Sequence, residues 1–132
     1  MPRDRLPVFF DGGCRPNPGA MELAVVLGGR TYRRADLGEG DSNEAEWLAL
    51  LHAVGLAAAA GGRDVVFVGD SALVIGQARG TQRCRDPRLQ VHLDAFHAAV
   101  AAIPRHRFRQ VPRSRNLAGI ALARSRPDDL DR

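Results

Sequence analysis

Short apolar runs separated by turn residues occupy the first third of the chain and predict β-strands. Residues 6–10 form one such run and residues 21–27 form a second. Gly28-Gly29 is typical of a hairpin turn, and a polar third strand is expected over residues 30–36. These three strands predict an antiparallel meander that ends in a loop over residues 37–40.

A long helical pattern follows the meander. Asp41, with Glu44 three residues later, resembles a capping box and predicts a helix over residues 42 to about 60. The continuous apolar run 65–68 is typical of a central strand that is covered on both faces. Because a long helix separates this run from the meander, we expect it to lie parallel to the first strand. The apolar face of the helix is expected to contain Ala45, Leu48, Leu51, Ala53 and Leu56.

The second half of the chain predicts three helices and one strand. Asp86 and Pro87 are suited to begin the longest of these helices, in which apolar residues recur every three or four positions. The expected helices cover residues 71–78, 86–103 and 116 to about 124, and the expected edge strand covers residues 105–111. The sequence therefore predicts one α/β domain over residues 1–132, with a five-stranded mixed sheet and a flexible tail over residues 125–132.

Charge and composition narrow the choice of partner and compartment. All 19 basic residues are arginine, against 15 acidic residues, so the chain is basic. Arginine pairs with phosphate in two-pronged fashion, which favours a nucleic-acid partner, although a genome rich in G and C would also replace lysine by arginine. Two cysteines, no apolar leader and no run long enough to span a bilayer predict a soluble, cytoplasmic protein without a membrane partner.

Two carboxylates follow predicted strands. Asp11 follows the first strand and Asp70 follows the apolar run 65–68. If those strands are parallel neighbours, both carboxylates lie at the same edge of the sheet, where open sheets bind ligands. Gly12 and Gly13 lack Cβ atoms and would let an anionic ligand approach the backbone. An ordinary hairpin loop, in which Asp11 caps a turn, fits these residues equally well.

Four segments together resemble type 1 ribonuclease H. They are Asp-Gly-Gly-Cys-Arg-Pro-Asn-Pro-Gly (residues 11–19), Ser-Asn-Glu-Ala-Glu (42–46), Val-Gly-Asp-Ser (68–71), and Val-Pro-Arg-Ser-Arg-Asn (111–116) ahead of Ala-Leu-Ala (121–123). The resemblance implies a ribonuclease H-like fold and metal-dependent hydrolysis of the RNA strand of RNA/DNA hybrids. It also implies that Asp11, Glu46 and Asp70 are catalytic and bind two Mg²⁺ or Mn²⁺ ions. A solvated helix residue remains the alternative for Glu46.

The chain departs from the family pattern in its last helix. The family has a fourth carboxylate there, and the corresponding residue in this chain is Ile120. An aliphatic side chain cannot ligate a metal ion, so the resemblance implies a weakened enzyme. In the segment before Glu46, Asp41 and Ser42 replace the threonine and the first asparagine of the family pattern.

The resemblance and the arginine clusters also suggest which residues contact nucleic acid. RNA is distinguished from DNA by its 2′-hydroxyls, which small polar groups and the backbone can recognise. For any single arginine, a solvated side chain is the alternative. The candidates are Gly12, Gly13, Cys14, Asn17, Ser42, Asn43, Arg79, Arg83, Arg85, Arg113, Arg115 and Asn116.

Three functions are therefore open at this point. The first is a monomeric endonuclease that cuts RNA in hybrids. The second is a catalytically silent protein that binds hybrid or double-stranded nucleic acid with the same fold. The third is a structural or partner-binding domain whose arginines serve solubility alone.

Overall fold

The computed structural model describes residues 5–124, which fold into a mixed sheet flanked by helices. The predicted tail over residues 125–132 lies outside the described residues. The strands are β1 (Arg5–Cys14), β2 (Gly19–Leu27), β3 (Arg30–Arg34), β4 (Glu39–Gly40), β5 (Asp64–Gly69) and β6 (Arg105–Gln110). The helices are α1 (Ser42–Ala59), α2 (Ala72–Arg79), α3 (Pro87–Val100) and α4 (Leu117–Arg124), with a 3₁₀ turn, η2, over Arg113–Arg115.

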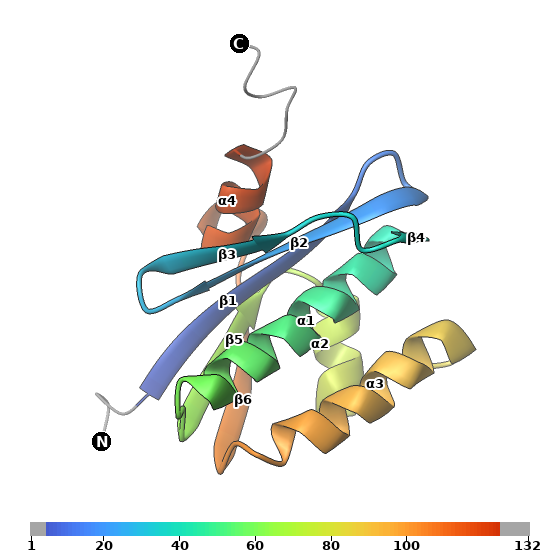
Figure 1. The fold of residues 1–132 in the computed structure, drawn as a ribbon. Coiled ribbons are helices and arrows are strands. Elements are labelled where there is room, and N and C mark those ends of the chain that lie inside the picture. Colours follow the sequence, from blue (N-terminus) through green and yellow to red (C-terminus); the bar gives the residue numbers. More distant parts are fainter. Residues whose placement is uncertain (1–4, 125–132) are drawn as a thin grey trace.

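The sheet has the strand order β3-β2-β1-β5-β6 (Figure 1). β1, β2 and β3 pair antiparallel, whereas β5 lies parallel to both β1 and β6. The predicted five-stranded mixed sheet is thus confirmed. The segment expected as a loop contains the two-residue strand β4, which pairs with the start of β2.

β1 is longer than the predicted strand over residues 6–10. It continues to Cys14 because β2 pairs with it throughout, from Val8 opposite Leu27 to Cys14 opposite Met21. Asp11 consequently lies inside a strand, opposite Ala24, rather than at the beginning of a loop. The apolar pattern of β1 ends at Phe10, so only the pairing with β2 reveals the extension.

Helices cover the two faces of the sheet unequally (Figure 1). α1, α2 and α3 lie on one face, and α4 packs on the other face against β1 and β2. The main core lies beneath α1 and includes Trp47, Leu50, Phe67 and Phe96. None of the helices within residues 5–124 combines the length and the apolar character that a bilayer span would require.

The buried face of α1 agrees only in part with the predicted one, since Ala45 and Ala53 are buried as expected. Its buried residues are Ala45, Trp47, Ala49, Leu50, Ala53, Val54 and Ala57, whereas Leu48, Leu51 and Leu56 are only partly buried. α1 packs against β1 and β2 on one side and against α3 on another. A helix that is apolar around most of its circumference cannot reveal from periodicity alone which side meets the sheet.

The predicted helix caps are present. The side chain of Asp41 accepts a hydrogen bond from the Glu44 backbone N–H at the start of α1 (2.9 Å), and Asp86 caps α3 by accepting from the Arg88 N–H (2.9 Å). The Glu44 carboxylate lies 3.0 Å from His92 Nε2 on α3. Glu44 therefore links α1 to α3 as well as occupying the third position of α1.

Candidate active site

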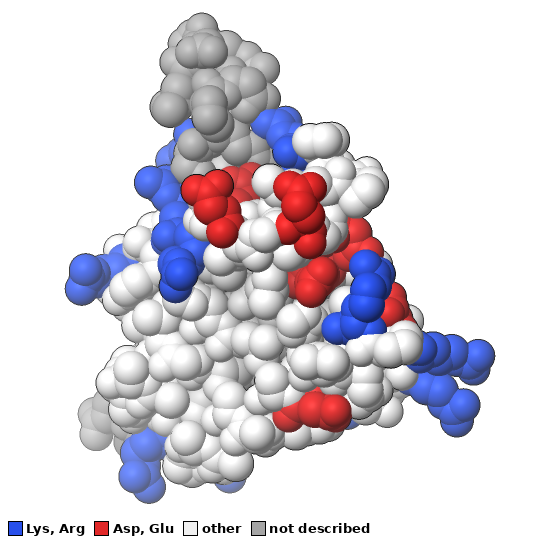
Figure 2. Space-filling view, turned by 45° about the vertical axis from the view of Figure 1, so that its right-hand side comes forward, with Lys and Arg blue, Asp and Glu red and all other residues white. Residues whose placement is uncertain are grey.

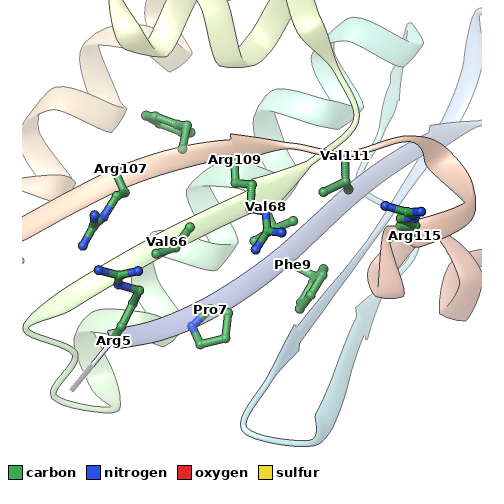
Figure 3. Close-up of a pocket in the computed structure, with 10 residues that line it drawn as sticks. Arg5, Pro7, Phe9, Val66, Val68, Arg107, Arg109, Val111 and Arg115 are labelled. Carbon is green, nitrogen blue, oxygen red and sulfur yellow. The ribbon is translucent and has the colours of Figure 1, made fainter. Parts of the chain in front are cut away.

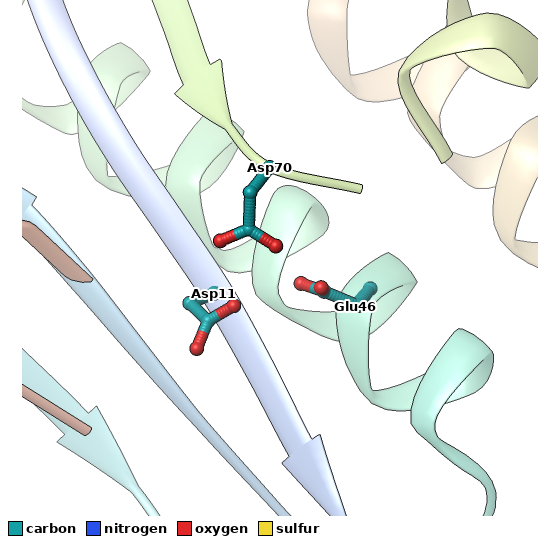
Figure 4. Close-up of side chains that lie close together, drawn as sticks. All are labelled: Asp11, Glu46 and Asp70. Atoms are coloured by element: carbon teal, nitrogen blue, oxygen red, sulfur yellow. The ribbon is translucent and has the colours of Figure 1, made fainter. Parts of the chain in front are cut away.

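Three acidic side chains from distant parts of the chain meet where β1 passes the end of β5 (Figure 4). The last paired residues of β1 and β5 are Phe9 and Val68, so two further residues along each chain bring Asp11 beside Asp70. Glu46 approaches from the second turn of α1. Carboxylate oxygens of the three residues lie within 4.8 Å of one another.

Gly12 sets the position of Glu46. Its backbone N–H donates a hydrogen bond to Glu46 Oε1 at 2.8 Å. A Cβ atom at Gly12 would lie 2.1 Å from the Ala45 carbonyl oxygen, so only glycine allows α1 to approach β1 this closely. The sequence suggested that this glycine leaves room for a ligand, but the space is filled by the helix that carries Glu46.

Asn116 sets the position of Asp70. Its Nδ2 group donates to Asp70 Oδ2 at 2.9 Å and to the Phe10 carbonyl at 3.0 Å, while its Oδ1 accepts from the Ala118 N–H at 3.1 Å. The side chain is completely buried. The expectation that Asn116 contacts nucleic acid is therefore corrected, because its polar groups are used within the protein and join β1, β5 and the start of α4.

The site concentrates negative charge in a poorly solvated place. Burial raises the pKa of Glu46 to about 9, and repulsion by Asp11 and then by Asp70 adds to the effect. The Gly12 N–H and the more distant guanidinium of Arg113 act in the opposite direction. Arg113 Nη2 lies 4.0 Å from Asp11 Oδ2, and the Asp11 side chain is completely buried.

These residues suit a divalent cation. Three carboxylates offer the hard oxygen ligands that Mg²⁺ and Mn²⁺ prefer, and a cation between them would offset the repulsion that raises the pKa of Glu46. Among residues 5–124, the cluster consists of Asp11, Glu46 and Asp70.

Helix α4 approaches the cluster through a glycine. A Cβ atom at Gly119 would lie 3.4 Å from Asp11 Oδ2, so α4 packs closely against Asp11. Ile120, which the sequence resemblance aligned with the fourth carboxylate of the family pattern, is partly exposed in the same helix. It contributes no ligand atom.

The small polar candidates for nucleic-acid contact lie in one region. Asn17 Nδ2 donates to Ser42 Oγ at 2.9 Å, and Asn17 Oδ1 accepts from the Ser42 N–H at 3.1 Å. Asn17 and Asn43 are exposed. This pair joins the β1–β2 turn to the start of α1, a few residues from Glu46.

Cys14 and Gly13 are less accessible than the sequence suggested. Both are buried, and Cys14 Sγ lies 3.3 Å from the carbonyl oxygens of Pro16 and Gly40. In β1, Gly13 pairs with Glu22 and Cys14 with Met21. Their backbone therefore belongs to the sheet, and the Cys14 side chain is not available to a ligand.

The arginines at the end of α2 and after it differ in their partners. Arg79, Arg83 and Arg85 are all exposed, and Arg79 also donates a hydrogen bond to the Phe108 carbonyl at 2.9 Å. Arg88 pairs with Asp41 at 3.0 Å and Asp86 at 2.9 Å. Figure 2 shows acidic side chains beside arginines on one face of the molecule, so this face is not uniformly basic.

Some functional contacts were not predicted from the sequence. The link from Asn116 to Asp70 joins residues 46 positions apart, and only the fold brings them together. An asparagine directly before an apolar helix is a common cap, and that pattern could have indicated an internal role for Asn116. The sequence around Arg113 did not predict that its guanidinium would lie near Asp11.

A mixed sheet of this order, with an acidic cluster beside its central strands, defines the ribonuclease H fold class. A family model described as reverse transcriptase-like matches residues 9–126. The chain therefore belongs to this family, and it resembles type 1 ribonuclease H over nearly its whole length.

Individual relatives agree with this assignment. Ribonuclease HI of Halobacterium salinarum is 33% identical over 95% of this chain, which spans 65% of that protein's length. The crystal structure of RNase H1 from the same archaeon matches with a TM-score of 0.84 at 30% identity, covering 96% of this chain and 98% of that one. The structure of LC11-RNase H1, solved in complex with an RNA/DNA hybrid, matches with a TM-score of 0.78 at 25% identity, covering 85% and 88%.

Proposed function

We propose that this protein is an endoribonuclease that hydrolyses the RNA strand of RNA/DNA hybrids with two divalent metal ions. The observation that carries the proposal is the cluster of Asp11, Glu46 and Asp70, whose carboxylate oxygens lie within 4.8 Å of one another. The ribonuclease H fold and the Halobacterium relative support it. The LC11 complex supports the choice of a hybrid as substrate.

The three acidic residues would act as metal ligands, and neighbouring groups hold them in position. Asp11, Glu46 and Asp70 would hold Mg²⁺ or Mn²⁺, which supplies charge stabilisation at the attacking and leaving oxygens of a phosphodiester. Glu46 must give up its proton to act as a ligand, which its pKa of about 9 opposes until a cation enters. Meanwhile the Gly12 N–H orients Glu46, and Asn116 orients Asp70.

The surroundings of the cluster would position the substrate. Arg113 is exposed, and its guanidinium lies 4.0 Å from Asp11, where it can pair with a phosphate oxygen. Asn17, Ser42 and Asn43 lie beside the start of α1 and present small polar groups of the kind that contact ribose 2′-hydroxyls. We place Arg83, Arg85 and Arg115 among the outer phosphate contacts.

Ile120 supports a second candidate function, a silent hybrid-binding protein. With three carboxylates instead of four, one metal ion would be held more weakly, and water would have to supply the missing ligand. A chain that keeps the binding surface but loses one ion would bind hybrids with strong salt dependence and would not cut them.

A hybrid-cleavage assay across Mg²⁺ and Mn²⁺ concentrations separates these functions. We expect the natural chain to cleave only when a divalent ion is present, Asp70→Asn to abolish cleavage, and Ile120→Asp to increase it at low metal concentration. Salt-sensitive binding without cleavage by the natural chain would replace the proposal by the silent binder. A lack of hybrid binding at low salt would exclude both.

The expected single domain, monomeric state and cytoplasmic location stay predictions. Size-exclusion chromatography with light scattering would test the monomer, and limited proteolysis would test the single domain. Localisation of a tagged chain would test the compartment.

A further inference from the structure

A second concave surface lies on the same face of the sheet as α4, in the part that α4 does not cover. It is a groove of about 580 Å³ across β1, β5 and β6 (Figure 3). Its floor is apolar and is formed by Pro7, Phe9, Val66 and Val68. Pro7 is exposed and Phe9 is partly exposed, whereas Val66 and Val68 are buried, so a ligand on this floor would contact mainly Pro7 and Phe9. Apart from Arg115, which the proposed function places among the outer phosphate contacts, the residues that line this surface have no part in the proposed catalytic chemistry.

Four arginines surround the apolar floor. Arg107 and Arg109 pair in register with Val66 and Val68 and therefore stand on the same face of the sheet, about 6.6 Å apart along β6. Arg5 lies with Arg107 at one end of the groove, and Arg115 lies at the other (Figure 3).

Three of these four arginines have no counterion among residues 5–124. Arg107 pairs with Asp64 at 3.1 Å. Within residues 5–124, the exposed side chains of Arg5, Arg109 and Arg115 form no ion pair. An apolar floor with several unpaired guanidinium groups around it complements a ligand that carries both anionic groups and flat apolar surfaces.

The groove adjoins a hollow beside the candidate active site. Val111 lines both the groove and a second hollow, which is also lined by Asp70 and Arg113. Arg115 lies two residues from Arg113 in η2. A chain that leaves the acidic cluster along this face would therefore pass from Arg113 over Arg115 toward Arg109 and Arg5.

We propose that this groove binds a single-stranded extension of the nucleic acid held at the candidate active site. This inference rests on the proposed function and adds a specificity to it, a preference for hybrids that carry an unpaired overhang. Arg5, Arg109 and Arg115 bind phosphates spaced along the extension, and a base stacks on Phe9. From Arg5 to Asp11, β1 spans about 20 Å. This length accommodates a few nucleotides of an extended single-stranded nucleic acid.

Fluorescence anisotropy in EDTA tests the proposal without cleavage. The probes are a labelled blunt RNA/DNA hybrid and the same hybrid with a short single-stranded overhang of either polarity. We expect the natural chain to bind one overhang hybrid about tenfold more tightly than the blunt hybrid. The double variant Arg5→Gln/Arg109→Gln should lose that advantage and still bind the blunt hybrid normally. Loss of two single-strand phosphate contacts should also reduce the slope of log K against log salt by about 1.4.

A matched control removes the same charge elsewhere. Arg33 and Arg34 are exposed on β3, away from the groove, and Arg33→Gln/Arg34→Gln should keep the overhang preference. Equal losses in the two double variants would overturn the proposal, because they would indicate a general charge effect. Circular dichroism and thermal unfolding establish that both variants are folded.

Further outcomes separate this inference from the proposed function. If the chain binds and cuts blunt hybrids but gains nothing from either overhang, the groove proposal fails alone. If it binds single strands through Arg5 and Arg109 but neither binds nor cuts blunt hybrids, the proposed function fails. If an acidic peptide binds in an Arg5- and Arg109-dependent way and overhangs do not, the groove is a protein-docking site and the proposal is overturned.

Discussion

Replacing Asn116 by alanine is expected to destabilise the fold and loosen Asp70 together. The change removes three hydrogen bonds of a completely buried side chain, to the partly buried Asp70, to the Phe10 carbonyl and from the Ala118 N–H. The two bonds to neutral groups contribute about 1 kcal/mol each and the bond to a carboxylate contributes about 2 kcal/mol, so the loss is about 4 kcal/mol. That is a large share of the roughly 5–15 kcal/mol by which a domain is stable.

Urea and thermal unfolding in EDTA would measure this loss. We expect Asn116→Ala to lower Tm by roughly 15 °C. Leu117→Ala is the matched control, because Leu117 is the next residue, is 46% exposed and should change stability by less than about 1 kcal/mol. A loss below about 1 kcal/mol in Asn116→Ala would refute the view that this side chain joins the strands to α4.

A second variant, Asn116→Asp, tests the contact with Asp70 separately. Aspartate keeps an oxygen that can accept from the Ala118 N–H but loses the donor and places a negative charge beside Asp70. We expect the stability difference between this variant and the natural chain to be larger at pH 8 than at pH 4, and to shrink when Mg²⁺ is added. An equal difference at both pH values would contradict the predicted repulsion.

Three other predictions concern the site and the core. The pKa of Glu46 rises from 4.5 to about 9 on folding, so the stabilising contribution of this residue is complete below pH 4.5 and is lost as the pH rises through 9. The free energy of unfolding in EDTA should therefore fall across this window, and Glu46→Gln should flatten its dependence on pH. Mg²⁺ should raise Tm more at pH 8.5 than at pH 5.5. Gly12→Ala should cost about 3 kcal/mol or more, because its Cβ would lie 2.1 Å from the Ala45 oxygen, and a wild-type urea midpoint would contradict this close approach. Gln77→Leu should cost about 1–3 kcal/mol, because it removes the acceptor 2.8 Å from the buried Trp47 Nε1, and the fluorescence of this single tryptophan would report both the change and the unfolding.

Much of the fold could be predicted from local patterns. The runs 6–10, 21–27 and 65–68 all lie in observed strands, and the caps Asp41 and Asp86 begin the expected helices. These features depend on residues within one or two turns of each other, because strand alternation, helix periodicity and capping are short-range effects. From the order of the strands and helices, the parallel pairing of β1 with β5 could also be predicted.

Features that depend on distant partners were decided only by the tertiary structure. β1 extends past its apolar run because β2 pairs with it, and α1 buries Trp47 rather than Leu48 because α3 lies against it. Asn116 becomes an internal link because the β1 backbone and Asp70 approach it in space.

The candidate site shows the same division. Its acidic residues were identifiable from motifs. Their mutual distance, the raised pKa of Glu46 and the roles of Gly12 and Asn116 arise when segments more than 20 residues apart are brought together. The arginine-lined groove has the same origin, because β1, β6 and η2 each contribute to it. Local sequence thus determined the helices and strands and the chemical groups that each carries. The tertiary fold determined which of these groups meet, since hydrogen bonding, desolvation and charge repulsion act over a few ångströms of space whatever the separation along the chain.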